Sequence, residues 1–166
     1  MNIILTSALS GIIFMFSGFV FKSKKALNIL AVLLFLVMII SAGVQLNGCE
    51  IFQGKYSNML ESDPYRVSFF ILLCLIGIYY TLVNRNNFSK PGSKVSDYFA
   101  LIFISFTGIA VLASFNNLLL MFLGIEILSI PLYALAGSAK HKMKSTEAAV
   151  KYFLMGAFST GIMLMG

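Results

Sequence analysis

The chain contains few charged residues for its length. Asp, Glu, Lys and Arg make up only 11% of its 166 residues, against about 25% in soluble domains. Hydrophobic residues make up 59%, and the mean hydropathy is +0.92. Because such a chain would expose too much apolar surface to water, a soluble globular domain is excluded. The composition predicts an integral membrane protein that contacts the lipid bilayer.

Residues that commonly bind metals or cofactors are also scarce. The two cysteines, Cys49 in a loop and Cys74 inside an apolar run, show no disulfide or metal-binding pattern. The single histidine, His141, lies in a basic loop, where it is expected to be solvated. The sequence has no glycine-rich phosphate loop and no haem or iron–sulfur spacing. We therefore expect no cofactor and no redox chemistry on this chain.

Six long apolar stretches account for most of the sequence. A bilayer core of about 30 Å requires about 20 apolar residues in helical conformation. Each stretch has roughly this length and is nearly free of charge, and continuous apolar runs favour helices over the alternating strands of a barrel. We predict an all-α fold, a polytopic transmembrane helix bundle that forms one incomplete membrane domain over residues 1–166. The predicted helices are 3–21, 27–46, 66–83, 98–115, 118–137 and 147–166.

Positive charges gather in alternate loops. The net charge of +6 would suggest a nucleic-acid partner in a soluble protein. Here the first, third and fifth loops are basic, the second (47–65) is mainly acidic and the fourth (116–117) is uncharged. Because basic loops face the cytoplasm, we predict a multi-pass protein with its N-terminus outside, in the periplasm, and no nucleic-acid partner. The absence of a transit peptide favours the bacterial inner membrane. The basic residues of the odd loops are Lys22, Lys24, Lys25, Arg85, Lys90, Lys94, Lys140, Lys142 and Lys144.

One carboxylate interrupts the fifth apolar stretch. Glu126 lies about 12 Å along the helix from Leu118, close to the middle of the membrane. A charge there costs at least about 2.5–3.5 kcal/mol, so such residues usually face a protein interior and have a function. Ser129 and Tyr133 share its helical face, and Pro131 is expected to kink the helix beside it. We predict that Glu126 carries protons, and the alternative is a permanently neutral structural side chain.

Two other cations lie near predicted helix ends. Lys151 is about one turn into the sixth helix on the cytoplasmic side. It could be a relay or tuning charge where protons enter, or an interfacial lysine that extends to the headgroups. Arg66 begins the third helix on the outer side, where we expect it to extend to the interface in the same way.

Short connections and small residues predict how the helices pack. Only Asn116 and Asn117 join the fourth and fifth helices, which must therefore be antiparallel neighbours. Thr146 is a suitable N-cap for the sixth helix. Pairs of small residues four apart, starting at Gly156 and Ala157, favour close packing of that helix against another.

Two adjacent segments resemble a known family. LGIEILSIPLYALAG, around Glu126, and KSTEAAVKYFLMGAFSTGIMLMG, around Lys151, are similar to the N subunits of bacterial NADH:quinone oxidoreductase, respiratory complex I. The similarity is strongest over 98–166 and looser over the first three helices. It implies a longer subunit with two inverted helical repeats, of which this chain is the N-terminal piece and supplies the first part of an antiporter-like fold.

The resemblance also implies roles for the residues. Glu126 would be the intramembrane carboxylate of a proton path and Lys151 the lysine of the sixth helix, both serving a translocase. In the family a lysine of the following helix pairs with this Glu, and that helix is absent here. NADH, FMN and iron–sulfur clusters would belong to other subunits. The implied partners are other complex I membrane subunits and, through the complex, quinone.

Two alternative interpretations remain open. A subunit of a multisubunit cation/proton antiporter shares the helix architecture without redox partners. A small structural or assembly membrane protein with six helices would use Glu126 only to pair with a lysine of its partner.

Overall fold

The computed structural model describes residues 2–20, 23–47, 60, 63–84, 95–139 and 142–166. Within these ranges the chain is mainly helical, and the six helices found there are all long and apolar enough to cross a membrane. The predicted all-α transmembrane bundle is confirmed. The helices are α1 (Asn2–Val20), α2 (Lys24–Leu46), α3 (Pro64–Val83), α5 (Val95–Leu112), α6 (Leu118–Ala136) and α7 (Met143–Met165).

The observed helix limits differ from the predicted ones at several ends. The largest shift is in α7, which begins at Met143 with Lys142 as its N-cap, so the predicted cap at Thr146 is wrong. The backbone N–H groups of Ser145 and Thr146 both donate to the Lys142 carbonyl, at 2.9 and 3.4 Å. Hydropathy locates only the apolar part of a helix, whereas Lys, Met and Glu extend it readily into a polar first turn.

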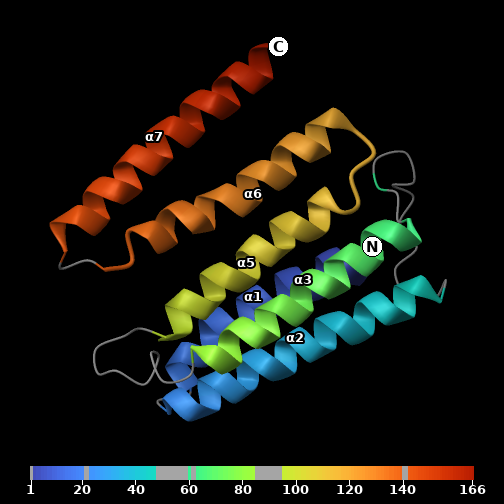
Figure 1. The fold of residues 1–166 in the computed structure, drawn as a ribbon. Helices are drawn as coiled ribbons and strands as arrows, with labels where there is room; N and C mark the ends of the chain where they lie inside the picture. Colours follow the sequence, from blue (N-terminus) through green and yellow to red (C-terminus); the bar gives the residue numbers. More distant parts are fainter. Residues whose placement is uncertain (1, 21–22, 48–59, 61–62, 85–94, 140–141) are drawn as a thin grey trace.

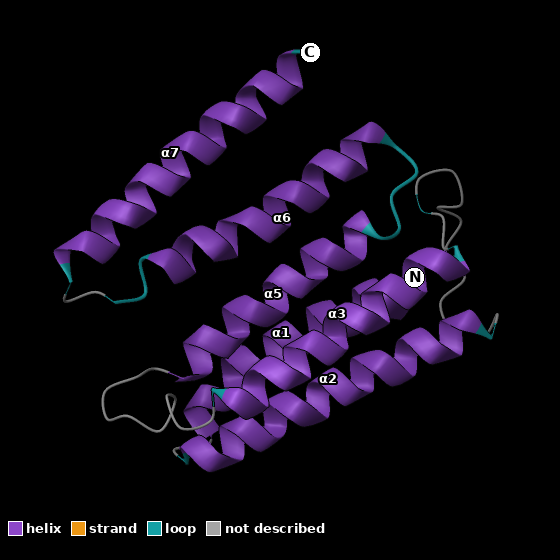
Figure 2. Cartoon of the chain, viewed as in Figure 1, coloured by secondary structure: helices purple, strands orange, loops and turns teal. Residues whose placement is uncertain are grey.

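Consecutive helices run in opposite directions along the bundle (Figure 1). In that view α1, α3 and α6 end, and α2, α5 and α7 begin, on the left. Helices α1, α2, α3 and α5 form a four-helix group, α6 packs on α5, and α7 packs on α6 (Figure 2). The predicted antiparallel pairing of the fourth and fifth helices is confirmed by the extensive α5–α6 contact. Residue Glu126 therefore lies on a helix outside the four-helix group.

Phenylalanine rings fill the centre of the four-helix group. Phe35 of α2 lies 4.6 Å from Phe103 of α5 between ring centroids, and Phe14 of α1 lies 5.4 Å from Phe103. All three side chains are fully buried. Aromatic pairs at these separations add about 0.5–1.5 kcal/mol each beyond the apolar area that they bury. The cluster fixes α5, which in turn supports α6.

Polar side chains join α1 to α2. The backbone N–H of Ile3 donates to Gln45 Oε1 at 3.3 Å, and the hydroxyls of Thr6 and Ser41 lie 2.9 Å apart. Interhelical hydrogen bonds of this kind stabilise membrane helix pairs by roughly 0.6–2 kcal/mol. They fix the alignment of the first two helices along their axes.

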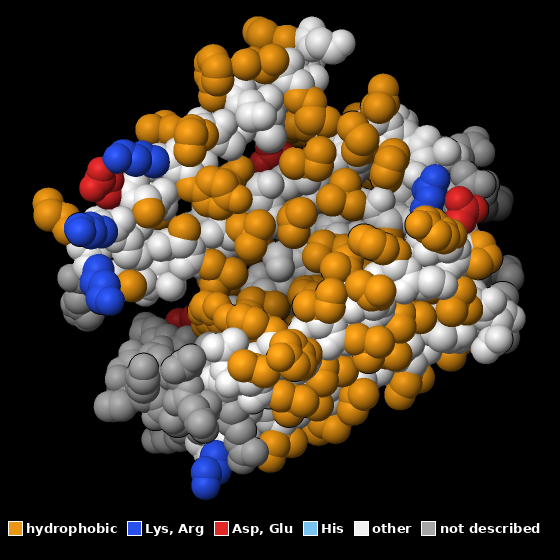
Figure 3. Space-filling model, viewed as in Figure 1, with side chains coloured by type: hydrophobic (Ala, Val, Ile, Leu, Met, Phe, Trp, Pro, Cys, Tyr) orange, Lys and Arg blue, Asp and Glu red, His pale blue; other side chains and the backbone are white. Residues whose placement is uncertain are grey.

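The outer surface of the bundle is apolar. Hydrophobic side chains cover the middle of the face drawn in Figure 3, and most of the charged groups in view lie toward the helix ends. Large side chains such as Phe19, Tyr79 and Leu118 are more than two-thirds exposed. This distribution is typical of a surface that contacts lipid.

Candidate functional site around Glu126

Two glycines bring α6 into close contact with α5. A Cβ atom added to Gly108 would collide with the backbone of Leu128, and one added to Gly124 would lie 2.8 Å from Leu112 Cγ. Gly124 and Pro131 are the buried residues of α6. Residues 124, 128 and 131 share one helical face, which is the face that packs on α5.

Glu126 lies on the opposite side of α6. It is two residues from both Gly124 and Leu128, so at about 100° per residue it points roughly 160–200° away from them. Tyr133 is seven residues further along, almost directly in line with Glu126 on the same face. The helix is continuous from Leu118 to Ala136, with Pro131 inside it between Glu126 and Tyr133.

The Tyr133 side of α6 is the side that packs on α7. The Tyr133 ring lies 4.9 Å from that of Tyr152 and 5.8 Å from that of Phe153, between centroids. A Cβ added to Gly156 would collide with the Tyr133 hydroxyl, so this glycine permits the contact. Glu126 therefore lies on the α7 side of α6, about 10 Å from Tyr133 along the helix axis.

The two helices separate toward the level of Glu126. Gly137 of α6 is opposite Ala149 of α7, and Tyr133 is opposite Gly156. Because the two helices are antiparallel, residues earlier in α6 are level with residues later in α7. Glu126 is therefore level with Gly161 or its neighbours. A Cβ added to Gly161 would meet nothing within 4 Å. Figure 1 shows α7 diverging from α6 toward the end marked C. Glu126 thus lies beside the more open part of the α6–α7 pair.

The Glu126 carboxylate is half-buried and unpaired within the described part of the chain. No hydrogen bond or ion pair joins it to another residue there. Ser129, although on a neighbouring part of the same face, donates its hydroxyl to the Ile125 carbonyl at 2.7 Å. The polar face therefore consists of a free carboxylate, a hydroxyl committed to its own helix, and the Tyr133 hydroxyl against α7.

Lys151 lies elsewhere. Its Nζ is 2.5 Å from Glu147 Oε1, and the lysine side chain is 68% exposed. By the helix offset it is level with Ala136, about 15 Å along the axis from Glu126. The structure does not bring Lys151 and Glu126 together, so a role for Lys151 stays a prediction.

The remaining candidate residues are buried, pack against a neighbouring helix, or fall outside the described residues. Cys74 is a free, buried thiol, whereas Cys49 and His141 lie outside the described ranges. Of the predicted small-residue pairs, the one at Gly156 contacts α6, whereas a Cβ added to Gly161 of the Ala157 pair would meet no described residue within 4 Å. No group of three or more His, Cys, Asp or Glu side chains could hold a metal ion among the residues whose positions are known.

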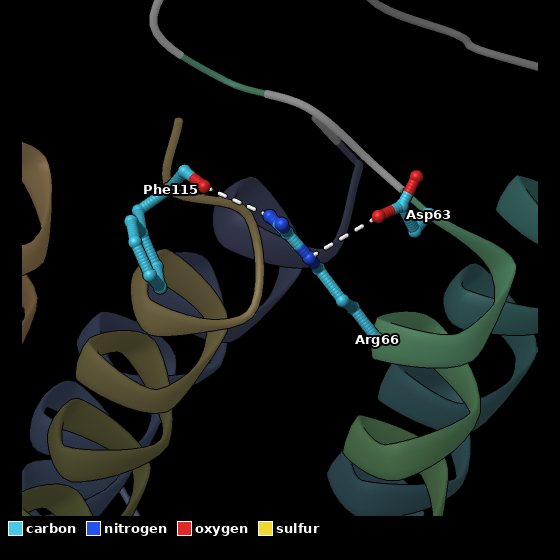
Figure 4. Close-up of polar contacts among 3 residues, drawn as sticks. All are labelled: Asp63, Arg66 and Phe115. Carbon is cyan, nitrogen blue, oxygen red and sulfur yellow. Dashed lines mark hydrogen bonds and ion pairs between the residues drawn. The ribbon is translucent and has the colours of Figure 1, made fainter. Parts of the chain in front are cut away.

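Sequence reasoning missed the contacts of Arg66. This side chain was expected to extend to the membrane interface, but it binds Asp63 and the backbone of Phe115 (Figure 4). The partner Asp63, three residues away, is readable from the sequence. The partner Phe115 is 49 residues away, and no sequence signal predicts that contact.

Comparisons with known proteins connect this geometry to a family. A family model described as NADH:quinone oxidoreductase/Mrp antiporter, transmembrane, matches residues 114–166. The NADH-quinone oxidoreductase subunit N of Cytophaga hutchinsonii is 39% identical over 166 residues, all of this chain and 35% of the relative. The subunit N of Flavobacterium johnsoniae is 40% identical over 111 residues, 67% of this chain and 24% of that relative.

Over its whole length the chain is similar to the N subunits of NADH-quinone oxidoreductase, and residues 114–166 match the antiporter-like transmembrane family model. The resemblance stated from the motifs is thereby confirmed. The segment matched by the family model begins just before α6 and includes both Glu126 and Lys151. The chain spans about a third of the length of the subunit N relative from Cytophaga hutchinsonii. The similarity to N subunits and the six apolar helices of the described residues together identify a multi-pass membrane protein.

Proposed function

We propose that this chain is part of a membrane subunit of a proton-translocating NADH-quinone oxidoreductase, and that Glu126 takes up and releases a proton during turnover. The observation that carries the proposal is a half-buried, unpaired carboxylate near the middle of a membrane helix, in the segment that matches the family model.

A change of charge nearby would drive the proton on or off. When a cation approaches Glu126, the ionised form is stabilised and the carboxyl group releases its proton to water or to the next acceptor. When the cation moves away or loses its own proton, the carboxylate takes up a proton again. Coupled groups of this kind titrate together, so motion of one charge is converted into transfer of one proton.

The rest of the subunit would supply that cation. No residue of α7 is buried, and α6 buries only two, so the faces around Glu126 are uncovered in the described part of the chain. We propose that later helices of the full-length subunit and neighbouring complex I membrane subunits cover these faces. Lys151 and Glu147, at the cytoplasmic end, would form a charge pair on the side from which protons enter.

The energy source, cofactors and membrane location that we propose for the subunit rest on its similarity to the same family. Electron transfer from NADH to quinone, through FMN and iron–sulfur clusters of other subunits, would provide the energy, and this chain would contribute to the translocase without carrying a cofactor. We place it in the bacterial inner membrane with the N-terminus in the periplasm, because the odd loops are basic.

Co-purification tests this assignment against the antiporter alternative, which the matched family description also includes. The full-length subunit, carrying an affinity tag, is expected to co-purify NADH:quinone oxidoreductase activity from solubilised membranes. Subunits of a cation/proton antiporter would instead purify without that activity and, in vesicles, exchange sodium for protons. Purification of the tagged subunit without any NADH-oxidising partner would overturn the proposal.

A further inference from the structure

The connection between α5 and α6 contains the backbone carbonyl of Phe115, which belongs to neither helix. After α5, Ala113 and Ser114 donate to the carbonyls of Ile109 and Val111, at 2.8 and 3.1 Å. The side chain of Asn117 then caps α6 by accepting from the Leu119 N–H at 3.3 Å. Phe115 lies between the last hydrogen bonds of α5 and the Asn117 cap of α6. Its carbonyl needs a donor from elsewhere, because an unpaired backbone group at the edge of a membrane is costly.

Arg66 of α3 supplies that donor (Figure 4). Its Nη1 donates to the Phe115 carbonyl at 2.8 Å, and its guanidinium carbon lies 5.6 Å from the centre of the Phe115 ring. Its Nε lies 3.3 Å from Asp63 Oδ2, and this carboxylate is about half exposed. Leu60 also forms an isolated antiparallel bridge with Phe115. Asp63, Arg66 and Phe115, here called the Arg66 cluster, thus tie the start of α3 to the α5–α6 connection.

Helix α6 is attached to the four-helix group through its extensive contact with α5. It lies outside the four-helix group, and the close glycine contacts hold it against α5 on only one side. The Arg66 cluster provides a second attachment for α6, in the connection immediately before that helix begins. From Leu118 to Glu126 the helix is continuous over about 12 Å, so a displacement at its start is transmitted to the carboxylate.

We propose that Arg66 is a positioning residue, which sets the rotation and depth of α6 and thereby the placement of Glu126. A long, permanently charged donor suits this task, because it reaches from α3 to the Phe115 carbonyl and forms a charge-assisted hydrogen bond there. The positioning of α6 is independent of the proposed function. Its effect on proton translocation rests on that function.

A cross-linking experiment in the full-length subunit tests the positioning directly. With both native cysteines replaced, Leu112→Cys and Gly124→Cys introduce a facing pair of thiols, and the shorter side chain at position 112 removes the Leu112 Cγ that an added Gly124 Cβ would meet at 2.8 Å. These thiols are expected to form a disulfide rapidly in oxidised membranes. Arg66→Gln is expected to slow the reaction by about fivefold or more, because disulfide formation requires specific geometry. Since the assay needs only membrane insertion, it works even where the variant fails to assemble into a complex.

Two variants separate positioning from a general structural effect. Arg66→Lys keeps a charged donor for the Phe115 carbonyl and should restore most of the cross-linking rate. Asp63→Asn keeps the Arg66–Phe115 hydrogen bond and should change the rate by less than about twofold, since exposed ion pairs contribute little. An unchanged rate in Arg66→Gln, or equal slowing in Arg66→Gln and Arg66→Lys, would overturn the proposal.

A functional measurement distinguishes failure of this proposal from failure of the proposed function. In the assembled complex, Arg66→Gln should shift the pH profile of proton translocation, and Arg66→Lys should return it to the native profile. If Glu126→Gln stops translocation but Arg66→Gln alters neither cross-linking nor the pH profile, the positioning role is wrong and the proposed function stands. If Glu126→Gln has no effect while Arg66→Gln slows cross-linking, positioning stands and the proposed function is wrong.

Discussion

Replacing Glu126 with Gln in the full-length subunit is expected to lower the rate of proton translocation by about tenfold or more, as loss of a positioned proton-transfer group does. Gln keeps the size and polarity of the side chain but cannot bind or release a proton. Because the Glu126 carboxylate makes no hydrogen bond or ion pair with the described residues, its removal should break no contact that holds the helices together. The measurement is proton uptake by vesicles that contain the purified complex, at a fixed NADH concentration.

The conservative variant Glu126→Asp is the matched control. It keeps an ionisable group one methylene shorter, and translocation should be intermediate between that of the native complex and that of Glu126→Gln. The amount of assembled complex, measured on native gels, should be the same in all three. If the assembled Glu126→Gln complex pumped protons at the native rate, the alternative of a structural carboxylate would be correct.

Replacing Gly108 with Leu is expected to prevent α6 from docking on α5. A side chain at this position would collide with the backbone of Leu128, which cannot move aside without displacing the helix. Overpacking of a well-packed interface costs about 1–3 kcal/mol, and a collision with backbone should reach or exceed the upper end of this range. The yield of folded subunit in detergent and its thermal unfolding temperature provide the measurement.

Gly161→Leu is the control for the same change in a membrane helix. A Cβ at Gly161 would meet no atom within 4 Å, so the larger side chain enters open space in the described structure. The yield and unfolding temperature of Gly161→Leu should stay close to those of the native protein. Equal losses for the two variants would show that any leucine at a helix glycine is harmful, and that the α5–α6 contact has no special importance.

The helices of this fold could be predicted from hydropathy because each must cross the same apolar layer. Their apolar lengths are visible in the sequence, and all six predicted spans correspond to helices. The ends of the helices were predicted less accurately. The polar first turn of α7, from Met143 to Thr146, has no apolar pattern, yet it continues the helix because its residues favour that conformation.

The site was only partly predictable. Glu126 stands out in the sequence because a carboxylate in the membrane interior is costly. Its rotation toward α7 required the glycine contacts of Gly108 and Gly124, which depend on the approach of two backbones. The contact between Arg66 and Phe115 joins residues far apart in the chain, so local sequence patterns could not predict it. The pairing of Lys151 with Glu147, four residues earlier, is a local helical pattern and was readable.

Infrared difference spectroscopy of the assembled complex during turnover tests the central claim most directly. If Glu126 gains and loses a proton, a protonated-carboxyl band should appear and disappear with NADH-driven turnover, shift in heavy water and be absent from Glu126→Gln. A spectrum in which the native complex and Glu126→Gln show the same carboxyl bands throughout turnover would mean that Glu126 keeps one protonation state. That result would contradict the account.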